Sequence, residues 1–262
     1  MTNIIQLRRN LSAPNRAPKW PFRLNRSRPL AQGLLAGTFF ASGVGDSFDL
    51  VSEQSDWAAN TATWTSGRGG VGLQTDNAFI SIPDPGIGAA GTIVMRFQEI
   101  SADGFGRYFE STGVSELVLF KHNTGPGTAS RFVIAGNTVT FTGLGDVSDG
   151  AVHTLIADWE DGSPDVRELT VDGILGGTSG TGFGVPAIGG SLMFGNLAAL
   201  NRDFNAIWYF IAIYNRRLNA AEKWMISINP AQIIEQPGRV TYFAPAAAAG
   251  IVPLRMMMGL GT

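Results

Sequence analysis

The fold is decided by one stretch of the chain, Asn205-Ala-Ile-Trp-Tyr-Phe-Ile-Ala-Ile-Tyr-Asn-Arg-Arg-Leu-Asn-Ala-Ala-Glu-Lys-Trp-Met-Ile-Ser-Ile-Asn-Pro230. Its first part, residues 206–214, is a continuous apolar run rich in β-branched and aromatic side chains. The run is too short for a buried helix and is bounded by polar residues. It therefore predicts a strand that is buried on both faces.

A short helix is predicted after this strand. Asn219 and Glu222 stand three residues apart, which is the spacing of a capping box with Asn in place of Ser or Thr. The helix is expected over Ala220–Ile228, where an Asn-Pro pair ends it. One face of this helix carries its large apolar side chains, Trp224, Met225 and Ile228.

The composition points to one large β domain. The 262 residues include 34 glycines, no cysteine and only 15% charged residues, while 44% are hydrophobic. Low charge and abundant glycine are typical of many strands joined by tight turns, and the hydrophobic fraction is sufficient for a sizeable core. Without cysteine, the chain has no disulfide, no cysteine-based metal site and no cysteine nucleophile.

No targeting segment or membrane partner is expected. Residues 1–9 lack the apolar core of a secretory signal peptide. No window of about 18 apolar residues could span a bilayer, and prolines and glycines interrupt the apolar residues 244–262. These features favour synthesis in the cytoplasm.

Charge is distributed unevenly along the chain. Residues 1–45 contain seven basic residues and no acid, so this segment carries +7, whereas the rest carries −9. The seven cations are Arg8, Arg9, Arg16, Lys19, Arg23, Arg26 and Arg28. This polarity predicts a basic arm attached to an acidic body.

The basic residues of the arm are separated by four prolines, Pro14, Pro18, Pro21 and Pro29. Prolines at this density prevent a helix and favour extended backbone. A solvated tail and an arm that lies on a partner both fit this composition, and the docked arm is the hypothesis we pursue. Because the cations and the aromatic residues Trp20 and Phe22 are spaced rather than clustered, the arm suits an acidic protein surface better than a nucleic acid.

Between the two ends, the chain contains roughly twelve predicted strands at intervals of about 8–15 residues. They cover residues 34–40, 70–74, 78–82, 92–100, 117–120, 132–135, 138–142, 151–159, 166–172, 192–194 and 206–214, with short strands or loops at 46–51 and 61–65. Hairpins are predicted between 70–74 and 78–82 and between 151–159 and 166–172, and a long loop over 176–190. The pattern predicts an all-β protein, an antiparallel β-sandwich jelly roll with one short C-terminal helix and extended N- and C-terminal arms.

The predicted organisation has three parts, because no repeat and no second composition regime interrupts the body. Residues 1–32 form the basic, proline-rich arm, residues 33–236 the β-sandwich, and residues 237–262 an apolar tail. The tail contains Ile251, Leu254, Met256, Met257 and Met258. Three adjacent methionines adapt to irregular grooves, so the tail is expected to bind a partner, with packing against its own domain as the alternative.

The order of motifs resembles the concanavalin A-like lectin/glucanase jelly roll in its laminin-G-like form. Residues 151–162, AVHTLIADWEDG, match the family's His-containing strand and Asp-Gly turn, although Val152 stands where Trp is usual. Residues 214–222, YNRRLNAAE, are similar to its closing strand signature. The resemblance covers about residues 30–232 and implies the fold, whereas the family includes enzymes, lectins and structural modules.

A narrower resemblance lies at the two ends of the body. Residues 28–37, RPLAQGLLAG, and residues 228–249, INPAQIIEQPGRVTYFAPAAAA, are similar to a group of tailed-bacteriophage virion proteins. Ala231 replaces the Trp of their Asn-Pro-Trp-Gln element. The resemblance implies a structural protein of the capsid or the tail.

The carboxylates do not form the pattern of a glycosidase. Such enzymes of this fold place acids at alternate positions of one strand, facing a cleft. Asp158 and Glu160 have that i, i+2 relation, but they precede Asp161 and a glycine at a strand end and favour a polar turn. We therefore expect no enzymatic activity, with a glycoside hydrolase or lyase as the least favoured alternative.

The two histidines, His122 and His153, offer no zinc-binding spacing. His153 lies on a predicted strand, where a structural hydrogen-bonding role is favoured over catalysis. Calcium binding is the one cofactor alternative, with Asp46, Asp49, Asp76 and Asp203 as candidate ligands. For sugar binding, Trp57, Trp64 and Tyr108 are the candidate aromatic residues, although core packing is the default for them.

Together these features favour a non-enzymatic virion decoration (cement) protein on the capsid surface. The arm and tail residues named above would bind the major capsid protein and sister copies, in a homo-oligomer. A carbohydrate- or receptor-binding module of a phage tail or head fibre is the alternative, with loops such as 176–190 as its binding site. A glycan is then a second partner, and a nucleic acid is disfavoured.

Overall fold

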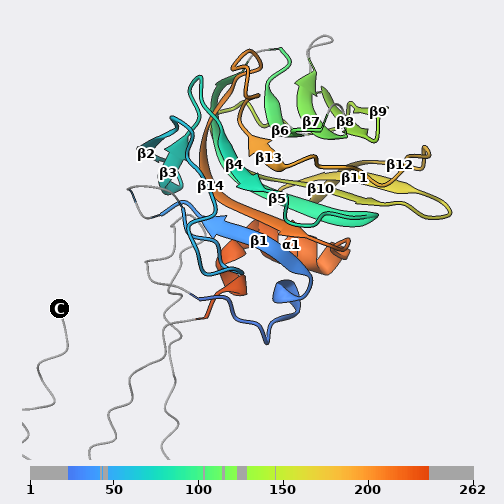
Figure 1. The fold of residues 1–262 in the computed structure, drawn as a ribbon, viewed down its shortest axis with the longest axis horizontal. Helices are drawn as coiled ribbons and strands as arrows, with labels where there is room; N and C mark the ends of the chain where they lie inside the picture. Colours follow the sequence, from blue (N-terminus) through green and yellow to red (C-terminus); the bar gives the residue numbers. More distant parts are fainter. Residues whose placement is uncertain are drawn as a thin grey trace, which may run out of the picture.

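The computed structural model describes residues 23–235, apart from residues 42, 44–46, 103, 114–115, 123–128 and 145. In this part of the chain, two antiparallel β-sheets lie face to face as a sandwich (Figure 1). One α-helix, α1 (Ala220–Ile228), and two 3-10 turns, η1 (Pro29–Ala31) and η2 (Pro230–Ile233), accompany the sheets. The predicted fold class, an antiparallel β-sandwich with one short helix near the C-terminal end, is confirmed.

The larger sheet has eight strands in the order β12-β11-β10-β5-β14-β3-β2, with β1 also paired to β14. Its strands are β1 (Leu34–Phe39), β2 (Thr63–Gly67), β3 (Gly70–Gln74), β5 (Ala90–Ala102), β10 (Val152–Glu160), β11 (Val166–Val171), β12 (Ile174–Ser179) and β14 (Phe204–Tyr214). The smaller sheet has six strands in the order β4-β13-β6-β7-β8-β9. They are β4 (Ile80–Pro83), β6 (Arg107–Ser111), β7 (Leu117–His122), β8 (Ala129–Ile134), β9 (Asn137–Phe141) and β13 (Ser191–Phe194).

Strand β14 is the centre of the larger sheet, and all of its residues are buried. It pairs with β5 along its length, with β3 at Ile207 and Trp208, and with β1 from Phe210 to Tyr214. Trp208 points into the core between the sheets, whereas Phe210 and Tyr214 belong to a second apolar cluster on the opposite face. Because both faces are covered, the strand needs no polar alternation, and the predicted doubly buried strand is confirmed.

Helix α1 lies over the outer face of the larger sheet and begins at the predicted capping box (Figure 1). The Asn219 side chain accepts a hydrogen bond from the Glu222 N–H at 3.0 Å, and the Glu222 carboxylate accepts one from the Asn219 N–H at 2.9 Å. The face that α1 turns to the sheet contains Glu222, Lys223 and Ile226. The predicted apolar face of this helix is instead largely exposed, because ion pairs of Glu222 and Lys223 fix its rotation.

The two ends of the described chain meet in an antiparallel bridge between Leu24 and Ile234. The Asn25 N–H donates to the Ile233 carbonyl at 2.8 Å, and the Glu235 N–H donates to the Arg23 carbonyl at 2.7 Å. Leu24, Ile233 and Ile234 are buried in the second apolar cluster. We call residues 23–25 and 233–235 the terminal clasp. The segments before and after it are therefore attached to the body at neighbouring points.

Three details of the predicted strand order are wrong. Residues 70–74 and 78–82 do not form a hairpin, because β3 belongs to the larger sheet and β4 to the smaller one. The polar Thr75-Asp76-Asn77 stretch between them carries the chain from one sheet to the other. Strands β6 and β12 were not predicted. Residues 47–51, by contrast, form a loop with an isolated bridge at Ser47, which is one of the two alternatives expected for residues 46–51.

Candidate functional site

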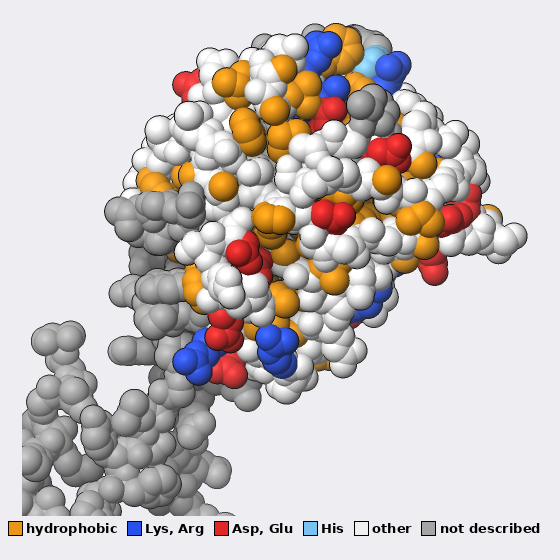
Figure 2. Space-filling model, viewed as in Figure 1, with side chains coloured by type: hydrophobic (Ala, Val, Ile, Leu, Met, Phe, Trp, Pro, Cys, Tyr) orange, Lys and Arg blue, Asp and Glu red, His pale blue; other side chains and the backbone are white. Residues whose placement is uncertain are grey.

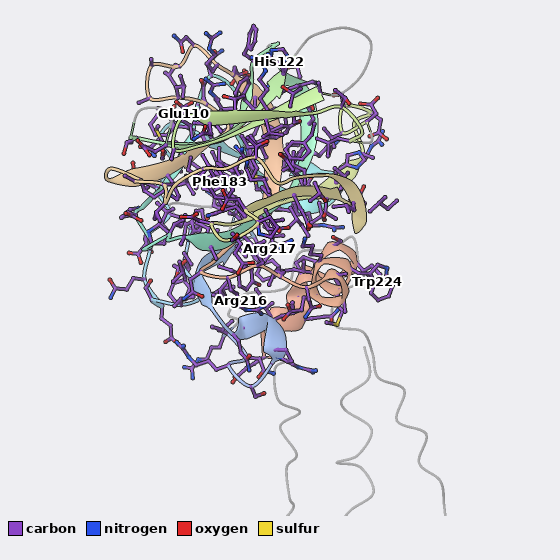
Figure 3. All side chains as sticks on the ribbon, turned by 90° about the vertical axis from the view of Figure 1, so that its right-hand side faces the viewer. Glu110, His122, Phe183, Arg216, Arg217 and Trp224 are labelled. Carbon is purple, nitrogen blue, oxygen red and sulfur yellow. The ribbon has the colours of Figure 1, made fainter. Side chains whose placement is uncertain are left out.

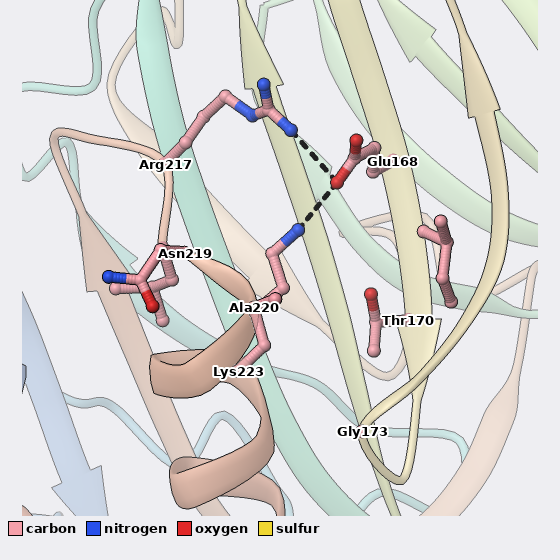
Figure 4. Close-up of a pocket in the computed structure, with 9 residues that line it drawn as sticks. Glu168, Thr170, Gly173, Arg217, Asn219, Ala220 and Lys223 are labelled. Atoms are coloured by element: carbon pink, nitrogen blue, oxygen red, sulfur yellow. Dashed lines mark hydrogen bonds and ion pairs between the residues drawn. The ribbon is translucent and has the colours of Figure 1, made fainter.

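A cluster of charged side chains lies between the larger sheet and α1. Asp158 of β10 is fully buried, and Arg217 Nε donates to its Oδ1 at 2.8 Å while Lys223 Nζ lies 2.5 Å from its Oδ2. The same two cations contact Oε2 of Glu168 on β11, at 2.9 Å from Arg217 Nη2 and 2.7 Å from Lys223 Nζ (Figure 4). The cluster thus attaches α1 and the turn before it to two strands.

The cations determine how the two carboxylates titrate. Burial raises the pKa of Asp158, although Lys223 and Arg217 act in the opposite direction. Burial also acts to raise the pKa of Glu168, but hydrogen bonds and charges from Lys223 and Arg217 outweigh it and lower this pKa. Because each carboxylate is already paired with two cations, the pair matches a structural brace rather than a general acid and base beside an open cleft.

A groove of about 470 Å³ lies beside this cluster, between α1 and the β11–β12 hairpin. Its walls combine charged and polar side chains with the apolar Leu175 and Leu218. Arg217 and Lys223 enter from one side and Glu168 from the other (Figure 4). The groove therefore offers fixed polar groups next to an apolar wall, which is the chemistry of a binding site.

Large apolar side chains are exposed at the end of this groove. Trp224 is 58% exposed and points away from the sandwich (Figure 3), and Ile228 follows one helical turn later with 42% exposure. On the neighbouring hairpin, Ile174 and Leu175 are 74% and 56% exposed. Trp224 packs over Gly173 of the same hairpin: a side chain at Gly173 would place its Cβ 3.3 Å from Trp224 Cδ1. Leu175 lines the groove beside α1, whereas Ile174 pairs with the core residue Val171 and so faces the other side of the sheet. We call Leu175, Trp224 and Ile228 the Trp224 surface.

The hairpin that carries Ile174 and Leu175 is held by His153. Nδ1 of His153 lies 2.7 Å from Oδ2 of Asp172, and its Nε2 lies 2.9 Å from Oδ1 of Asp149. The other Asp172 oxygen accepts a hydrogen bond from the Thr154 N–H at 2.8 Å. The hydrogen bond that the His153 ring donates to the Asp172 carboxylate, together with Asp149, raises the pKa of His153 to about 9 against its partial burial. His153 has the hydrogen-bonding role that its strand position favoured.

The candidate calcium ligands that the structure describes, Asp49, Asp76 and Asp203, do not form a metal site. Asp49 is buried and accepts hydrogen bonds from the Trp57 indole and from the Gly37 and Val51 N–H groups. Asp203 accepts a hydrogen bond from the N–H of Asn77, the residue after Asp76. Asp46 lies outside the described residues. Among the residues that the structure describes, no group of three or more His, Asp or Glu side chains could hold a metal ion.

The candidate sugar-binding aromatics are mostly unavailable. Trp57 and Tyr108 are fully buried in the core, and Trp64 is partly buried against it. The predicted loop 176–190 begins as strand β12, whose glycines Gly176 and Gly177 lie against Leu144 and Phe141. Core packing, the default expected for these residues, is therefore confirmed for Trp57 and Tyr108, whose rings are not available to stack on a sugar.

Most of the predicted partner-binding residues lie outside the described residues. These are Arg8, Arg9, Arg16, Lys19, Trp20, Phe22, Ile251, Leu254, Met256, Met257 and Met258. Arg23, Arg26 and Arg28 are described and exposed, on the segment that leads from the terminal clasp to η1. Their binding role stays a prediction. No helix within the described residues has the length and apolarity needed to cross a membrane.

Sequence reasoning missed the Trp224 surface. Asp172 and Gly173 form the turn between β11 and β12, and both have positive φ angles, of 51° and 82°, as a two-residue hairpin turn requires. An Asp-Gly pair after a strand predicts a hairpin and therefore a returning strand. This strand is β12, the edge strand that carries Leu175. The rotation of α1 could not be predicted, since it depends on strand residues far away in the sequence.

The fold is similar to several solved β-sandwich structures at low sequence identity. Domain 4 of AbnA, a GH43 extracellular arabinanase from Geobacillus stearothermophilus, in complex with arabinotriose, aligns with a TM-score of 0.60 and 13% identity, over 74% of this chain and 98% of that one. The binding domain of Paraclostridial Mosquitocidal Protein 1 aligns with a TM-score of 0.58 and 12% identity, over 76% and 52% of the two chains.

A third similar structure is Trypanosoma rangeli sialidase in complex with sialic acid, with a TM-score of 0.56 and 16% identity. The alignment covers 76% of this chain but only 33% of the sialidase, so this chain spans a fraction of that enzyme. No protein-family model and no curated protein matches the sequence. The similarities support the β-sandwich fold alone and leave function to the surface features described above.

Proposed function

We propose that the protein is a non-catalytic attachment module that binds another protein through the Trp224 surface. The observation that carries this proposal is the exposure of three large apolar side chains, Leu175, Trp224 and Ile228, on α1 and the adjoining β11–β12 hairpin. Contiguous exposed apolar groups on a soluble domain mark interaction sites, and tryptophan is enriched among the residues that dominate binding energy. The charged groove beside them supplies the polar rim that such interfaces have.

In its finer form, the proposal is a decoration protein of a tailed-bacteriophage capsid. The resemblance of the segments around residues 28–37 and 228–249 to phage virion proteins supports it. The terminal clasp adds a geometric argument: the basic arm and the apolar tail are attached at neighbouring points, close to α1. Both segments and the Trp224 surface would then engage the same capsid face, through complementary charge and apolar burial.

The paired carboxylates support the non-catalytic part of the proposal. Asp158 and Glu160, which have the spacing of a glycosidase pair, both face Arg217, at 2.8 and 3.8 Å respectively. Arg217 and Lys223 cover the Asp158 carboxylate, so it cannot protonate a leaving group. Assays on polysaccharides are expected to detect no hydrolysis or elimination, and robust turnover would contradict this part of the proposal.

The test uses phage particles that lack the protein, incubated with purified full-length chain and separated by sedimentation. We expect Trp224→Ser to lower occupancy on the particle at least tenfold, because it removes the central apolar contact. Val185→Ser is the matched control, since Val185 is 54% exposed and lies outside the Trp224 surface. Full occupancy by the Trp224→Ser variant would contradict the proposal.

A second variant separates the arm from the surface. Deletion of residues 2–22 removes four of the seven cations of the basic arm, together with Trp20 and Phe22, but leaves the Leu24–Ile234 bridge of the clasp intact. We expect this deletion to weaken attachment while circular dichroism and thermal unfolding of the body stay unchanged. Normal occupancy by the deletion variant would contradict the role of the arm without affecting the role of the Trp224 surface.

The alternative function is a carbohydrate- or receptor-binding module. The fold similarity favours it, since the arabinanase domain is described in complex with arabinotriose and the mosquitocidal fragment as a binding domain. A glycan array probed with the full-length chain distinguishes the two functions. Specific glycan binding that Trp224→Ser abolishes would assign the Trp224 surface to a saccharide instead of a capsid protein.

A further inference from the structure

A second unusual surface lies on the outer face of the smaller sheet. The strand register places Phe120 of β7 directly opposite Arg107 of β6 and opposite Arg131 of β8. Neighbouring strands are about 4.8 Å apart, so these three side chains form one cross-strand row. The guanidinium carbon of Arg107 lies over the Phe120 ring, 4.4 Å from its centroid.

Three further side chains extend this row. The Phe105 ring lies 6.4 Å from Phe120 and 5.5 Å from His122, and the Arg202 guanidinium carbon lies 5.3 Å from the Phe105 centroid. The Arg202 carbonyl accepts a hydrogen bond from the Arg107 N–H at 3.1 Å, which joins the two arginines through the backbone. We call Phe105, Arg107, Phe120, His122, Arg131 and Arg202 the Arg–Phe surface.

The Arg–Phe surface is positively charged on an acidic body. Residues 29–235 contain ten basic and 21 acidic residues, and three of those ten cations gather here. Glu110 pairs with Arg107 at 2.6 Å, which leaves an excess of two positive charges. Arg202 is exposed and forms no ion pair with the described residues. Burial and the charge of Arg131 lower the pKa of His122, in agreement with a positive local potential.

This surface lies away from the attachment region. Figure 3 labels His122 at the top of the molecule, at the far end from Trp224 and Arg216. Figure 2 shows Lys and Arg side chains and a His beside hydrophobic side chains at that same end. A module attached through the clasp and the Trp224 surface would therefore present the Arg–Phe surface outward.

We propose that the Arg–Phe surface binds a saccharide that carries carboxylate groups. Phe105, 42% exposed, offers a ring face on which the apolar face of a sugar ring can pack. Arg131 and Arg202 offer guanidinium groups, which bind carboxylates in a bidentate manner. Residues 29–235 carry a net charge of −11, which would repel a long polyphosphate chain that extends beyond the Arg–Phe surface. A short carboxylated saccharide is therefore the favoured ligand.

The experiment titrates the full-length chain with four oligosaccharides by calorimetry. Hexagalacturonate and 3′-sialyllactose are the carboxylated probes, and maltohexaose and lactose are their neutral counterparts. We expect at least one carboxylated probe to bind tenfold or more tightly than its neutral counterpart, and this preference to shrink as salt screens the charges. Comparison of the two carboxylated probes distinguishes a uronic acid from a sialic acid.

The variants Arg202→Gln and Phe105→Ser test the surface itself. Each is expected to weaken binding of the preferred probe at least tenfold, since one removes a guanidinium and the other a ring face. Arg202→Lys, which keeps the charge but loses the planar fork, is expected to weaken it by a smaller factor. Arg68→Gln is the matched control, because Arg68 is also exposed and lies outside this surface.

Two results would overturn the proposal. One is equal binding of carboxylated and neutral probes, or no binding of either, by a chain whose circular dichroism is intact. The other is tighter binding of an oligoglutamate peptide or an oligonucleotide, which would assign the surface to another class of ligand. Neither result affects the proposed attachment function, which Trp224→Ser tests on particles.

Discussion

The imidazole of His153 and the carboxylate of Asp172 lie 2.7 Å apart and join strand β10 to the turn between β11 and β12. This contact positions the hairpin that carries Leu175, a residue of the Trp224 surface. A titratable pair therefore supports a surface that is itself uncharged. The contact also makes the stability of the body dependent on pH.

We predict that stability falls as the pH rises from about 6.5 to about 9. The folded pKa of His153, about 9, lies above its unfolded value of about 6.5. The charged imidazole therefore stabilises the fold fully below pH 6.5, and this contribution is lost as the pH rises through 9. Urea unfolding across this range measures it, and His153→Gln should show a flatter profile. Parallel profiles for the two proteins would contradict the prediction.

Loss of the Asp158 carboxylate should be costly. Asp158→Asn leaves Arg217 and Lys223 near a buried amide, with Glu168 as their remaining close acid. Breaking a buried ion pair in this way typically costs about 3–5 kcal/mol in free energy of unfolding. Chemical denaturation measures the loss. The control Glu160→Gln alters an acid that is 56% exposed and 3.8 Å from Arg217, and should change stability by less than about 0.5 kcal/mol.

Arg167 is a buried cation that contacts carbonyl groups. Its Nη1 donates to the Asn137 carbonyl at 2.6 Å and its Nη2 to the Thr181 carbonyl at 3.1 Å. We predict that Arg167→Met lowers the free energy of unfolding by about 2 kcal/mol, because both carbonyls lose the donor that the fully buried Arg167 supplies. The exposed Arg68→Met is the control for the substitution itself. Equal stability of the two variants would argue against this role.

Removal of the capping box should weaken α1. Asn219→Ala removes the acceptor for the Glu222 N–H, which costs about 1 kcal/mol in typical helices. Thermal unfolding gives the change in stability. Asn219→Asp keeps an acceptor at the cap and should restore most of it. If Asp restores nothing, the effect of Asn219 comes from some contact other than the cap.

The elements that could be predicted from the sequence are those whose signal lies in adjacent residues. The doubly buried strand β14 follows from an unbroken apolar run, and the bounds of α1 follow from its capping box. The β10–β11 hairpin likewise follows from its turn residues. In each case, adjacent residues carry the whole signal.

The relations between distant elements could not be predicted. The polar stretch between β3 and β4 is compatible with a hairpin and with a crossing from one sheet to the other. The crossing results from the pairing of β3 with β14 and of β4 with β13, which are distant in the sequence. Trp224 is exposed because Lys223 binds Asp158 and Glu168 on strands more than 50 residues earlier. The Arg–Phe surface depends on the β6–β7–β8 register, and β6 itself was missed.

The Leu24–Ile234 bridge has a mechanical consequence. Since this pairing is antiparallel, the chain enters at Arg23 and leaves at Glu235 on the same side of the bridge. A force that pulls the two flanking segments apart would open its hydrogen bonds one after another, like a zipper. A force that pulls both segments in the same direction would stretch the hydrogen bonds of the bridge far less. The body would then bear that force at the one place where both segments are attached.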